Sequence, residues 1–272
     1  MLIQQDHTDF HNIIELRNIS QSYDGGNNWV IKDLNFLVED KPDQGQFVII
    51  LGMSGCGKST LLRYISGLQN PTEGQVFVKD KPVDKNTRIP MVFQEYSSLP
   101  WKTVLENVGL ALEYQGVKKK ERDERAMEII KMVGLEGHEK KYAIYPTLSG
   151  GQLQRVAIAR SILSNPEIIL MDEPFGALDV KTRLQMQDLV TDLWEKFHST
   201  IIFVTHDIGE AVYLGDDIYI MKANPGQFAE HIKVDLPLNR TREIKRDQHY
   251  TQLVHHVEDM MIKVAETTGG SF

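Results

Sequence analysis

The stretch GMSGCGKST at residues 52–60 constrains the fold of this chain more than any other feature. It fits the pattern G-x-x-x-x-G-K-[ST] and directly follows the apolar run FVIIL. After it, Leu61, Leu62, Ile65 and Leu68 recur at helical spacing. A strand, a glycine-rich loop and a helix in this order are typical of nucleoside triphosphate binding, so we favour this interpretation over an ordinary glycine turn.

Each residue type in this loop suits contact with phosphates. Gly52, Gly55 and Gly57 let the backbone wrap an anion without Cβ clashes, and the helix N-terminus favours negative charge. Lys58 supplies a positive charge to the β and γ phosphates, and the Ser59 hydroxyl suits Mg²⁺. The side chain of the single cysteine is expected to be incidental there. The expected ATP-binding residues of the loop are Gly52, Ser54, Gly55, Cys56, Gly57, Lys58, Ser59 and Thr60.

Two carboxylates end the apolar strand IILMDE at residues 168–173. We expect Asp172 to face Mg²⁺ and Glu173 to polarise the attacking water as general base. An aspartate and a glutamate after a strand can also begin an ordinary loop. The phosphate loop upstream in the same predicted sheet favours the catalytic interpretation.

Two further polar residues follow strand-like runs. His206 ends IIFVTH, and ligands bind at the carboxyl ends of strands in doubly wound sheets, so contact with the γ-phosphate is plausible. Gln94 ends the run MVF, and its spacing alone indicates no role.

Strands and helices alternate along much of the chain, which predicts a mainly parallel sheet with helices on both faces. The N-terminal runs IIELRNIS and VIKDLNFLVE predict two strands joined by a turn, and the charged segment ERDERAMEIIKMVGLEG predicts a helix inside an insertion. The expected domains are an α/β core of residues 13–97 and 147–222, an inserted helical subdomain of residues 98–146, and a C-terminal extension of residues 223–272.

Composition excludes several classes of protein. Acidic residues outnumber basic ones by 38 to 30, which argues against nucleic acid as a partner. A single cysteine rules out an intrachain disulfide and fits a reducing compartment. The N-terminus lacks a signal-peptide pattern. The longest apolar run has five residues, far below the ~20 of a membrane span, so another chain would have to bring this one to a membrane.

The stretch LSGGQLQR at residues 148–155 predicts a second anion site, because a serine and two glycines precede a helix. The chain already has a phosphate loop, so this second site needs an explanation.

The motifs GMSGCGKST, VFQE, LSGGQ, ILMDEP, ALD and THD occur in this order. The set resembles the ATP-binding cassette of ABC transporters over roughly residues 13 to 222. The resemblance implies a P-loop NTPase fold of the α/β class, with a mainly parallel core, an N-terminal antiparallel part and an inserted helical subdomain. It also implies ATP hydrolysis with ATP and Mg²⁺ bound.

The resemblance adds roles that the residues alone leave open. Gln94 looks like the glutamine that touches Mg²⁺ and senses the transmembrane partner. Tyr23 looks like the aromatic that stacks on adenine, with a packed strand-end aromatic as the alternative. Asp179 looks like the aspartate that couples two subunits, and His206 looks like the switch histidine. The expected catalytic residues are Glu173, His206 and Lys58, and the expected metal ligands are Ser59, Gln94 and Asp172.

In the family, the signature motif serves a second cassette. Ser149, Gly150, Gly151 and Gln152 would act on the ATP held by the phosphate loop of a partner chain, and two ATP molecules would be buried between two cassettes, as in a homodimer. The helical subdomain would pass this motion to permease subunits at the cytoplasmic face of the inner membrane. An external solute-binding protein would take part indirectly.

Longer stretches resemble one subgroup. SSLPWKTVLENV, MDEPFGALDVKTRLQ and VTHDIGEAVYLGDDIYIM are similar to the ATPases of nitrate, sulfonate, taurine and bicarbonate importers. Those importers commonly have LSGGM where this chain has Gln152. The alternatives are a soluble ABC-type ATPase with a non-membrane partner and a phosphotransferase. The compact insertion disfavours the first alternative, and LSGGQ would be unexplained in the second.

Overall fold

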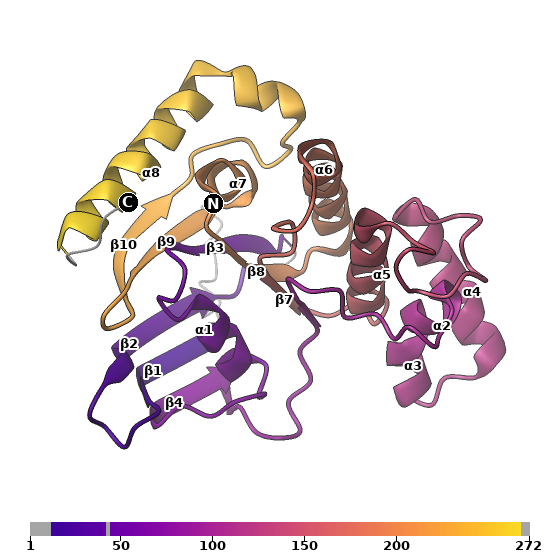
Figure 1. The fold of residues 1–272 in the computed structure, drawn as a ribbon, viewed down its shortest axis with the longest axis horizontal. Helices are drawn as coiled ribbons and strands as arrows, with labels where there is room; N and C mark the ends of the chain where they lie inside the picture. The colour runs from indigo at the N-terminus through magenta and orange to yellow at the C-terminus, as the bar shows by residue number, and fades with distance from the viewer. Residues whose placement is uncertain (1–11, 42–43, 268–272) are drawn as a thin grey trace, which may run out of the picture.

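The computed structural model of the chain describes residues 12–41 and 44–267 (Figure 1). Its strands are β1 (Asn12–Ser22), β2 (Trp29–Glu39), β3 (Gln46–Gly52), β4 (Glu73–Val78), β5 (Lys81–Pro82), β6 (Met91–Val92), β7 (Ile168–Asp172), β8 (Thr200–Thr205), β9 (Asp217–Lys222) and β10 (Gln227–Lys233). Its helices are α1 (Lys58–Ile65), α2 (Val104–Val108), α3 (Leu110–Tyr114), α4 (Lys119–Met132), α5 (Gly150–Ile162), α6 (Val180–Phe197), α7 (Ile208–Leu214) and α8 (Gln248–Thr267), with a 3-10 helix η1 (Arg242–Arg246).

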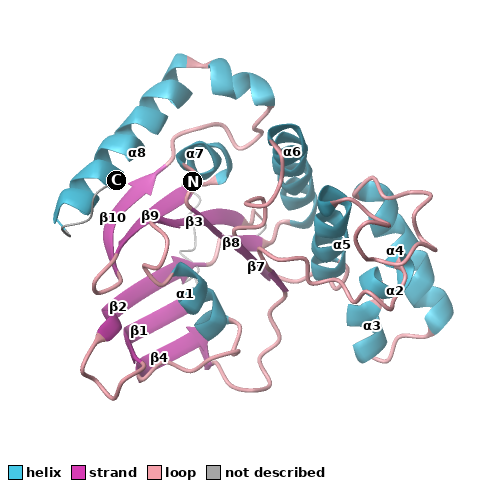
Figure 2. Ribbon diagram, viewed as in Figure 1, coloured by secondary structure: helices cyan, strands magenta, loops and turns pink. Residues whose placement is uncertain are grey.

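The strands form two sheets (Figure 2). The larger sheet has the order β10-β9-β3-β8-β7-β6, and β3, β6, β7, β8 and β9 run parallel while β10 is antiparallel to β9. The smaller sheet has the order β2-β1-β4-β5 and is antiparallel. The expectation of a mainly parallel core with an N-terminal antiparallel part is confirmed.

Strand β3 separates two hydrophobic cores, because successive side chains of a strand point to opposite faces. Phe47, Ile49 and Leu51 pack into the core under the helices, whereas Val48 and Ile50 pack into the core shared with the antiparallel sheet. This double burial explains why the strand before the phosphate loop is a continuous apolar run.

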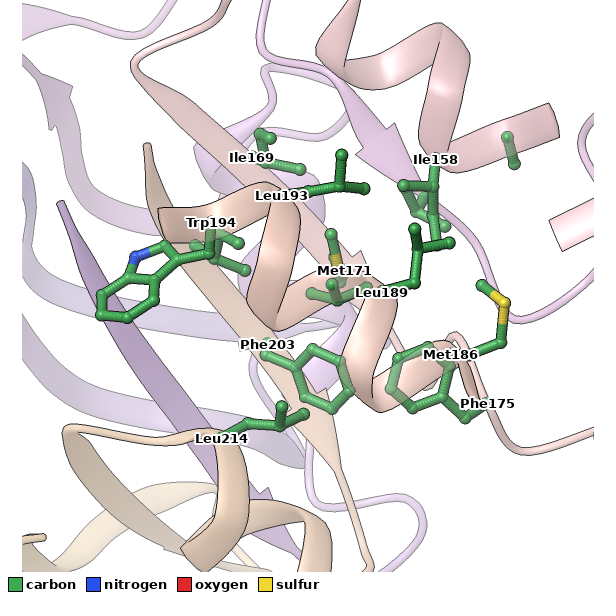
Figure 3. Close-up of a cluster of buried hydrophobic side chains, with 14 of the residues drawn as sticks. Ile158, Ile169, Met171, Phe175, Met186, Leu189, Leu193, Trp194, Phe203 and Leu214 are labelled. Atoms are coloured by element: carbon green, nitrogen blue, oxygen red, sulfur yellow. The ribbon is translucent and has the colours of Figure 1, made fainter. Parts of the chain in front are cut away.

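The core under the helices joins β7 and β8 to α5, α6 and α7. Figure 3 shows Met171 of β7 and Phe203 of β8 near Leu189 and Leu193 of α6. This packing holds the ends of two strands that carry polar site residues.

Helices α2, α3 and α4 lie between β6 and α5, in the part of the chain where we expected the helical insertion. In α4, Ala126, Ile129 and Ile130 are buried, and the helix stops before Gly134 at φ +68°. Helix α5 contacts α2 and α4 on one side and α6 on the other (Figure 1), so it joins the insertion to the core. The boundary of the subdomain at residues 98–146 stays a prediction.

Two details of the predicted helices are wrong. Leu68 is not on the helix after the phosphate loop: α1 ends at Ile65, Gly67 has φ +73°, and Leu68 is exposed. The spacing of Ile244, Leu253, Val257 and Met261 predicts one last amphipathic helix. Ile244 lies instead in η1, because Asp247 has extended backbone and its carboxylate accepts a hydrogen bond from the His249 amide at the start of α8.

Some expectations fall at the ends of the chain. The segment in which we expected no signal peptide includes residues 1–11, and the extension includes residues 268–272, and both stretches lie outside the described residues. Within residues 12–41 and 44–267, no helix has the length and apolar character needed to cross a membrane.

Candidate functional site

The candidate site lies where parallel strands β3, β6, β7 and β8 end. The order of the larger sheet puts these carboxyl ends along one edge, although they come from segments far apart in the chain. Lys58 follows β3, Gln94 follows β6, Glu173 follows β7 and His206 follows β8. The fold therefore gathers four expected site residues at one edge.

Lys58 is held inside the phosphate loop. Its side chain is only 4% exposed, and Nζ donates to the carbonyl oxygens of Gly52 at 2.8 Å and Met53 at 2.9 Å. These bonds fold the loop around the ammonium and direct the charge along the start of α1. Nζ also lies 3.9 Å from Oε1 of Glu173.

The loop leaves the N-terminus of α1 open to an anion. Gly57 is the N-cap residue, with φ +107°, and the helix has neither a side-chain cap nor an acidic residue in its first turn. The thiol of Cys56 packs into the core shared with the antiparallel sheet, and burial raises its pKa. Cys56 could therefore meet a ligand only through its backbone. Ser54 and Gly55 are exposed, and Thr60 is half-buried in α1.

Ser59 and Asp172 form the oxygen pair expected for a metal. The Ser59 hydroxyl donates to Oδ1 of Asp172 at 2.9 Å, across two elements. Asp172 is 9% exposed, and burial raises its pKa while the hydrogen bond from Ser59 acts in the opposite direction. A cation nearby would stabilise the charged form of this buried carboxylate.

Glu173 and His206 form a second pair. Nδ1 of His206 lies 2.9 Å from Oε2 of Glu173, whose side chain is 15% exposed, while the histidine is exposed. Glu173 has φ +43°, in the left-handed region, and its amide donates to the Val204 carbonyl. The chain therefore turns sharply after β7 and aims this carboxylate toward both Lys58 and His206.

Gln94 approaches the same edge from β6. A Cβ atom added to Gly176 would lie 3.4 Å from Nε2 of Gln94 and 3.9 Å from Oε2 of Glu173, so both side chains border the same glycine. Tyr23 lies in the loop between β1 and β2. It is 66% exposed, so it is not the packed core aromatic of the alternative interpretation, and its hydroxyl accepts from Gln69 at 3.2 Å.

The signature motif begins α5. Ser149 and Gln152 form a reciprocal capping box, and Nε2 of Gln152 lies 3.0 Å from Nε2 of His138. A side chain at Gly150 would have to displace Tyr96, because an added Cβ would lie 2.1 Å from the hydroxyl of this exposed tyrosine. Helix α5 stands apart from α1 (Figure 1). The structure therefore separates the signature helix from the helix of the chain's own phosphate loop.

Asp179 is the N-cap of α6, and its carboxylate accepts from the backbone and side chain of Thr182. These hydrogen bonds, the side-chain bond first, lower the pKa of this exposed aspartate.

A group of buried polar residues lies beside His206 and was not predicted from the sequence. Glu210 is 5% exposed and accepts from Thr205, and Gln187 is 3% exposed and donates to Glu210. The only local signal was the three-residue spacing of Asp207 and Glu210, which is typical of a helix start. The partners on α6 and β8 could not be predicted from that spacing.

These residues fit a magnesium nucleotide. The buried Lys58 ammonium, the open start of α1 and the Ser59–Asp172 oxygen pair supply a cation, amide donors and metal ligands. The described residues hold no cluster of three or more histidine, cysteine, aspartate or glutamate side chains suited to a metal. A site of this kind suits Mg²⁺, which usually binds through one or two protein ligands together with phosphates.

Comparison with known proteins identifies the family. A family model described as ABC transporter matches residues 32–176, just over half of the chain. The chain belongs to the ABC transporter family. An uncharacterised ABC transporter ATP-binding protein of Methanocaldococcus jannaschii is 46% identical over 222 residues, covering 81% of this chain and 82% of the relative.

Relatives named for import are also similar to this chain. The nitrate import ATP-binding protein NrtD of Synechocystis is 37% identical, covering 91% of this chain and 94% of the relative. The taurine import ATP-binding protein TauB of Rhizobium johnstonii is 41% identical, covering 81% and 88%.

A solved structure is similar at the level of the fold and the sequence. The dimeric ATP-binding cassette MJ0796, in a post-hydrolysis state with ADP and phosphate, has a TM-score of 0.70 and 35% identity, covering 82% of this chain and all of that one. This chain, as a member of the ABC transporter family, therefore binds ATP and is an ATPase.

Proposed function

We propose that the chain is the ATP-hydrolysing motor of an ABC importer, working on the cytoplasmic face of the membrane through a separate permease. One observation carries the proposal: Lys58, Glu173 and His206 meet at one sheet edge in a chain whose named relatives drive import.

In this proposal the three residues divide the chemistry of hydrolysis. Glu173 acts as general base on the attacking water, and its distance of 2.9 Å from His206 keeps the carboxylate oriented. His206 faces the γ-phosphate with the nitrogen that Glu173 does not hold. Lys58 offsets charge on the β and γ phosphates.

Mg²⁺ would be held by Ser59, Gln94 and Asp172, where it neutralises phosphate charge. The bond between Ser59 and Asp172 already brings two of these ligands together. Tyr23 would stack on adenine, since its ring is exposed in the loop between β1 and β2.

A second cassette, most simply a second copy of this chain, would complete the site. The Ser149 side chain is exposed at the start of α5, apart from α1, and the relative MJ0796 is dimeric with nucleotide. We propose that Ser149, Gly150, Gly151 and Gln152 act on the partner's ATP, with Asp179 coupling the two chains.

The insertion offers a surface for a permease. Residues 102–104 and 141–143 run side by side, joined by backbone hydrogen bonds. The exposed aromatics Trp101, Tyr142 and Tyr145 lie in these two segments or within two residues of them. Exposed aromatic clusters are typical of protein interfaces. Gln94 lies in the segment between β6 and this surface, which supports its role in sensing the permease.

The cargo would be a small solute, of the anionic nitrate, sulfonate or taurine kind, and the motor itself would not touch it. The permease and an external binding protein would select it. The names of the nitrate and taurine relatives support this class of solute.

A pull-down from the native cell tests the proposal. Tagged Glu173→Gln protein would be recovered from gently solubilised membranes with Mg·ATP, and we expect a polytopic membrane protein to accompany it. Tyr145→Ser in the same background should lose that partner, whereas the control Tyr114→Ser, on the 82% exposed tyrosine of α3, should keep it. Recovery of soluble partners alone, with the chain absent from membranes, would favour a soluble ABC-type ATPase instead.

A further inference from the structure

A line of polar side chains that leads into the protein interior begins in the C-terminal extension, at the half-buried Lys245 of η1. Nζ of Lys245 donates to Oε1 of Gln187 on α6 at 2.7 Å and lies 3.9 Å from the centre of the Tyr213 ring. An ammonium group has only donors, so it orients the amide of Gln187 with its oxygen toward η1 and its nitrogen toward α7.

The line continues to Glu210 on α7. Nε2 of Gln187 donates to Oε1 of Glu210 at 3.3 Å, and the other carboxylate oxygen accepts from the Thr205 hydroxyl at 2.8 Å. Gln187, Glu210 and Thr205 are 3%, 5% and 2% exposed. Hydrogen bonds in such a setting are strong when all are made and costly when one is lost.

Thr205 and Asp207, the residues before and after His206, both form hydrogen bonds with Glu210. The Thr205 hydroxyl, besides donating to Glu210, accepts from the Asp207 amide at 3.0 Å, and the Asp207 carboxylate accepts from the Glu210 amide at 2.8 Å. The backbone that carries His206 is therefore held on each side, which directs the ring toward Glu173 at 2.9 Å.

The charges around this line are balanced across several elements. Arg183 of α6 places Nε 3.8 Å from Oε1 of Glu210 and Nη1 3.7 Å from the Asp207 carboxylate. Asp188 and Arg242 also face Lys245. Removing the Lys245 ammonium would leave the Gln187 carbonyl oxygen buried without this donor and would free its amide to turn away from Glu210.

We propose that Lys245 is a positioning residue for His206: through Gln187 and Glu210 it fixes the backbone of Thr205 and Asp207 and so keeps the histidine on Glu173. The inference rests on the proposed role of His206 in hydrolysis. It gives the C-terminal extension a function, since the extension would hold the end of β8 in the hydrolytic arrangement.

A second contact from the extension supports this arrangement. The Tyr250 hydroxyl of α8 donates to the Gly209 carbonyl at 3.1 Å, in the first turn of α7. The extension therefore contacts the start of α7 in two ways. Lys245 acts through the side chains of Gln187 and Glu210, and Tyr250 bonds directly to the backbone of Gly209.

Steady-state ATPase measurements on the full chain test the inference. Lys245→Met keeps an unbranched side chain of similar length but removes the ammonium donors, and we expect kcat to fall by roughly 3- to 30-fold while KM for ATP stays within about twofold. Lys245→Arg should restore most of kcat. The control Lys263→Met, on an exposed lysine of α8, should match the parent. An unchanged kcat in Lys245→Met, or equal losses of kcat and ATP affinity together with a lowered unfolding temperature, would overturn the inference.

A double variant separates this inference from the proposed function. If Lys245 acts through His206, the variant His206→Ala with Lys245→Met should turn over no more slowly than His206→Ala alone. Full additivity of the two losses would overturn the inference and leave the role of His206 intact. Wild-type turnover in His206→Ala would instead overturn the proposed role of His206 itself.

Discussion

Nδ1 of His206 lies 2.9 Å from Oε2 of Glu173, joining the ends of the neighbouring parallel strands β7 and β8. The two residues are 33 positions apart in the chain. The left-handed backbone of Glu173 turns its carboxylate between His206 and Lys58, so both contacts are made by one side chain. A carboxylate oriented from two sides is well suited to act on a single water molecule.

Glu173→Gln should lower turnover by roughly 10²–10⁴-fold if Glu173 is the general base, because the amide keeps the shape but cannot accept the proton. ATP affinity should stay near that of the parent, since Lys58 and the loop are unchanged. Single-turnover hydrolysis measures the loss of turnover, and calorimetric titration with ATP measures the affinity. Glu195→Gln, on an exposed glutamate of α6, is the control. Parental turnover in Glu173→Gln would rule out the general-base role.

Ser149→Arg should spare ATP binding by the monomer and block ATP-dependent dimerisation, because the new side chain would fill the space proposed for the partner's phosphate. Loss of the helix cap alone could cost about 1 kcal/mol. Thr103→Arg controls for that cost, since Thr103 caps α2 with the same kind of capping box, made with Glu106. Light scattering with ATP in the Glu173→Gln background measures dimerisation. A dimer formed by Ser149→Arg would contradict the cross-subunit role of LSGGQ.

Asp172→Asn should stabilise the ligand-free protein and abolish its stabilisation by Mg·ATP. Burial raises the pKa of Asp172 in the fold, so its stability contribution is most favourable at low pH and is lost as pH rises through the folded-state pKa. At neutral pH the charged carboxylate therefore destabilises the empty site, and asparagine removes that charge while still accepting from Ser59.

The unfolding temperature of Asp172→Asn measures this trade-off. We expect it to rise by roughly 2–4 °C for each kcal/mol gained in the absence of ligand at pH 7, and the gain should shrink toward pH 4. Added Mg·ATP should raise the unfolding temperature of the parent but scarcely that of the variant. A ligand-free variant less stable than the parent would mean that burial of this charge is offset by other contacts.

Asp24→Asn should weaken ATP binding by about fivefold, because the asparagine amide loses one acceptor oxygen and loosens the loop that carries Tyr23. Asn28, through its backbone amide first, and the Ser22 hydroxyl lower the pKa of the Asp24 carboxyl to about 2. A lowered pKa means that the interaction is complete above the ordinary pKa of an aspartate and is lost as pH falls toward 2. The effect on affinity should therefore be the same from pH 6 to pH 8.

Calorimetric titrations with ATP measure this effect. Asp33→Asn, on an exposed aspartate of β2, is the control and should bind ATP like the parent. Tyr23→Ala should weaken binding more than Asp24→Asn if the ring stacks on adenine. Equal affinities for Tyr23→Ala and the parent would remove Tyr23 from the site.

Local patterns were sufficient to predict most elements. The apolar run before GMSGCGKST became β3, and the spacing of Ala126, Ile129 and Ile130 marked the buried face of α4. The helix predictions were wrong at Leu68 and Ile244, because the spacing of apolar residues does not reveal where a helix ends. Gly67 has a left-handed backbone after α1, and Asp247 separates η1 from α8.

The sequence by itself determined which residue types stand at the strand ends, because a glycine-rich loop, paired carboxylates and a strand-end histidine are local patterns. Only the tertiary structure decided which of them meet. The order of the parallel strands brings Glu173 to His206 and Ser59 to Asp172, and no local spacing encodes that order. For the same reason, the sequence did not reveal the line from Lys245 to Glu210. Lys245 and Gln187 are 58 positions apart, and Gln187 and Glu210 are 23 apart. Their pairing depends on burial against one another, which arises only when the sheet and its helices have packed.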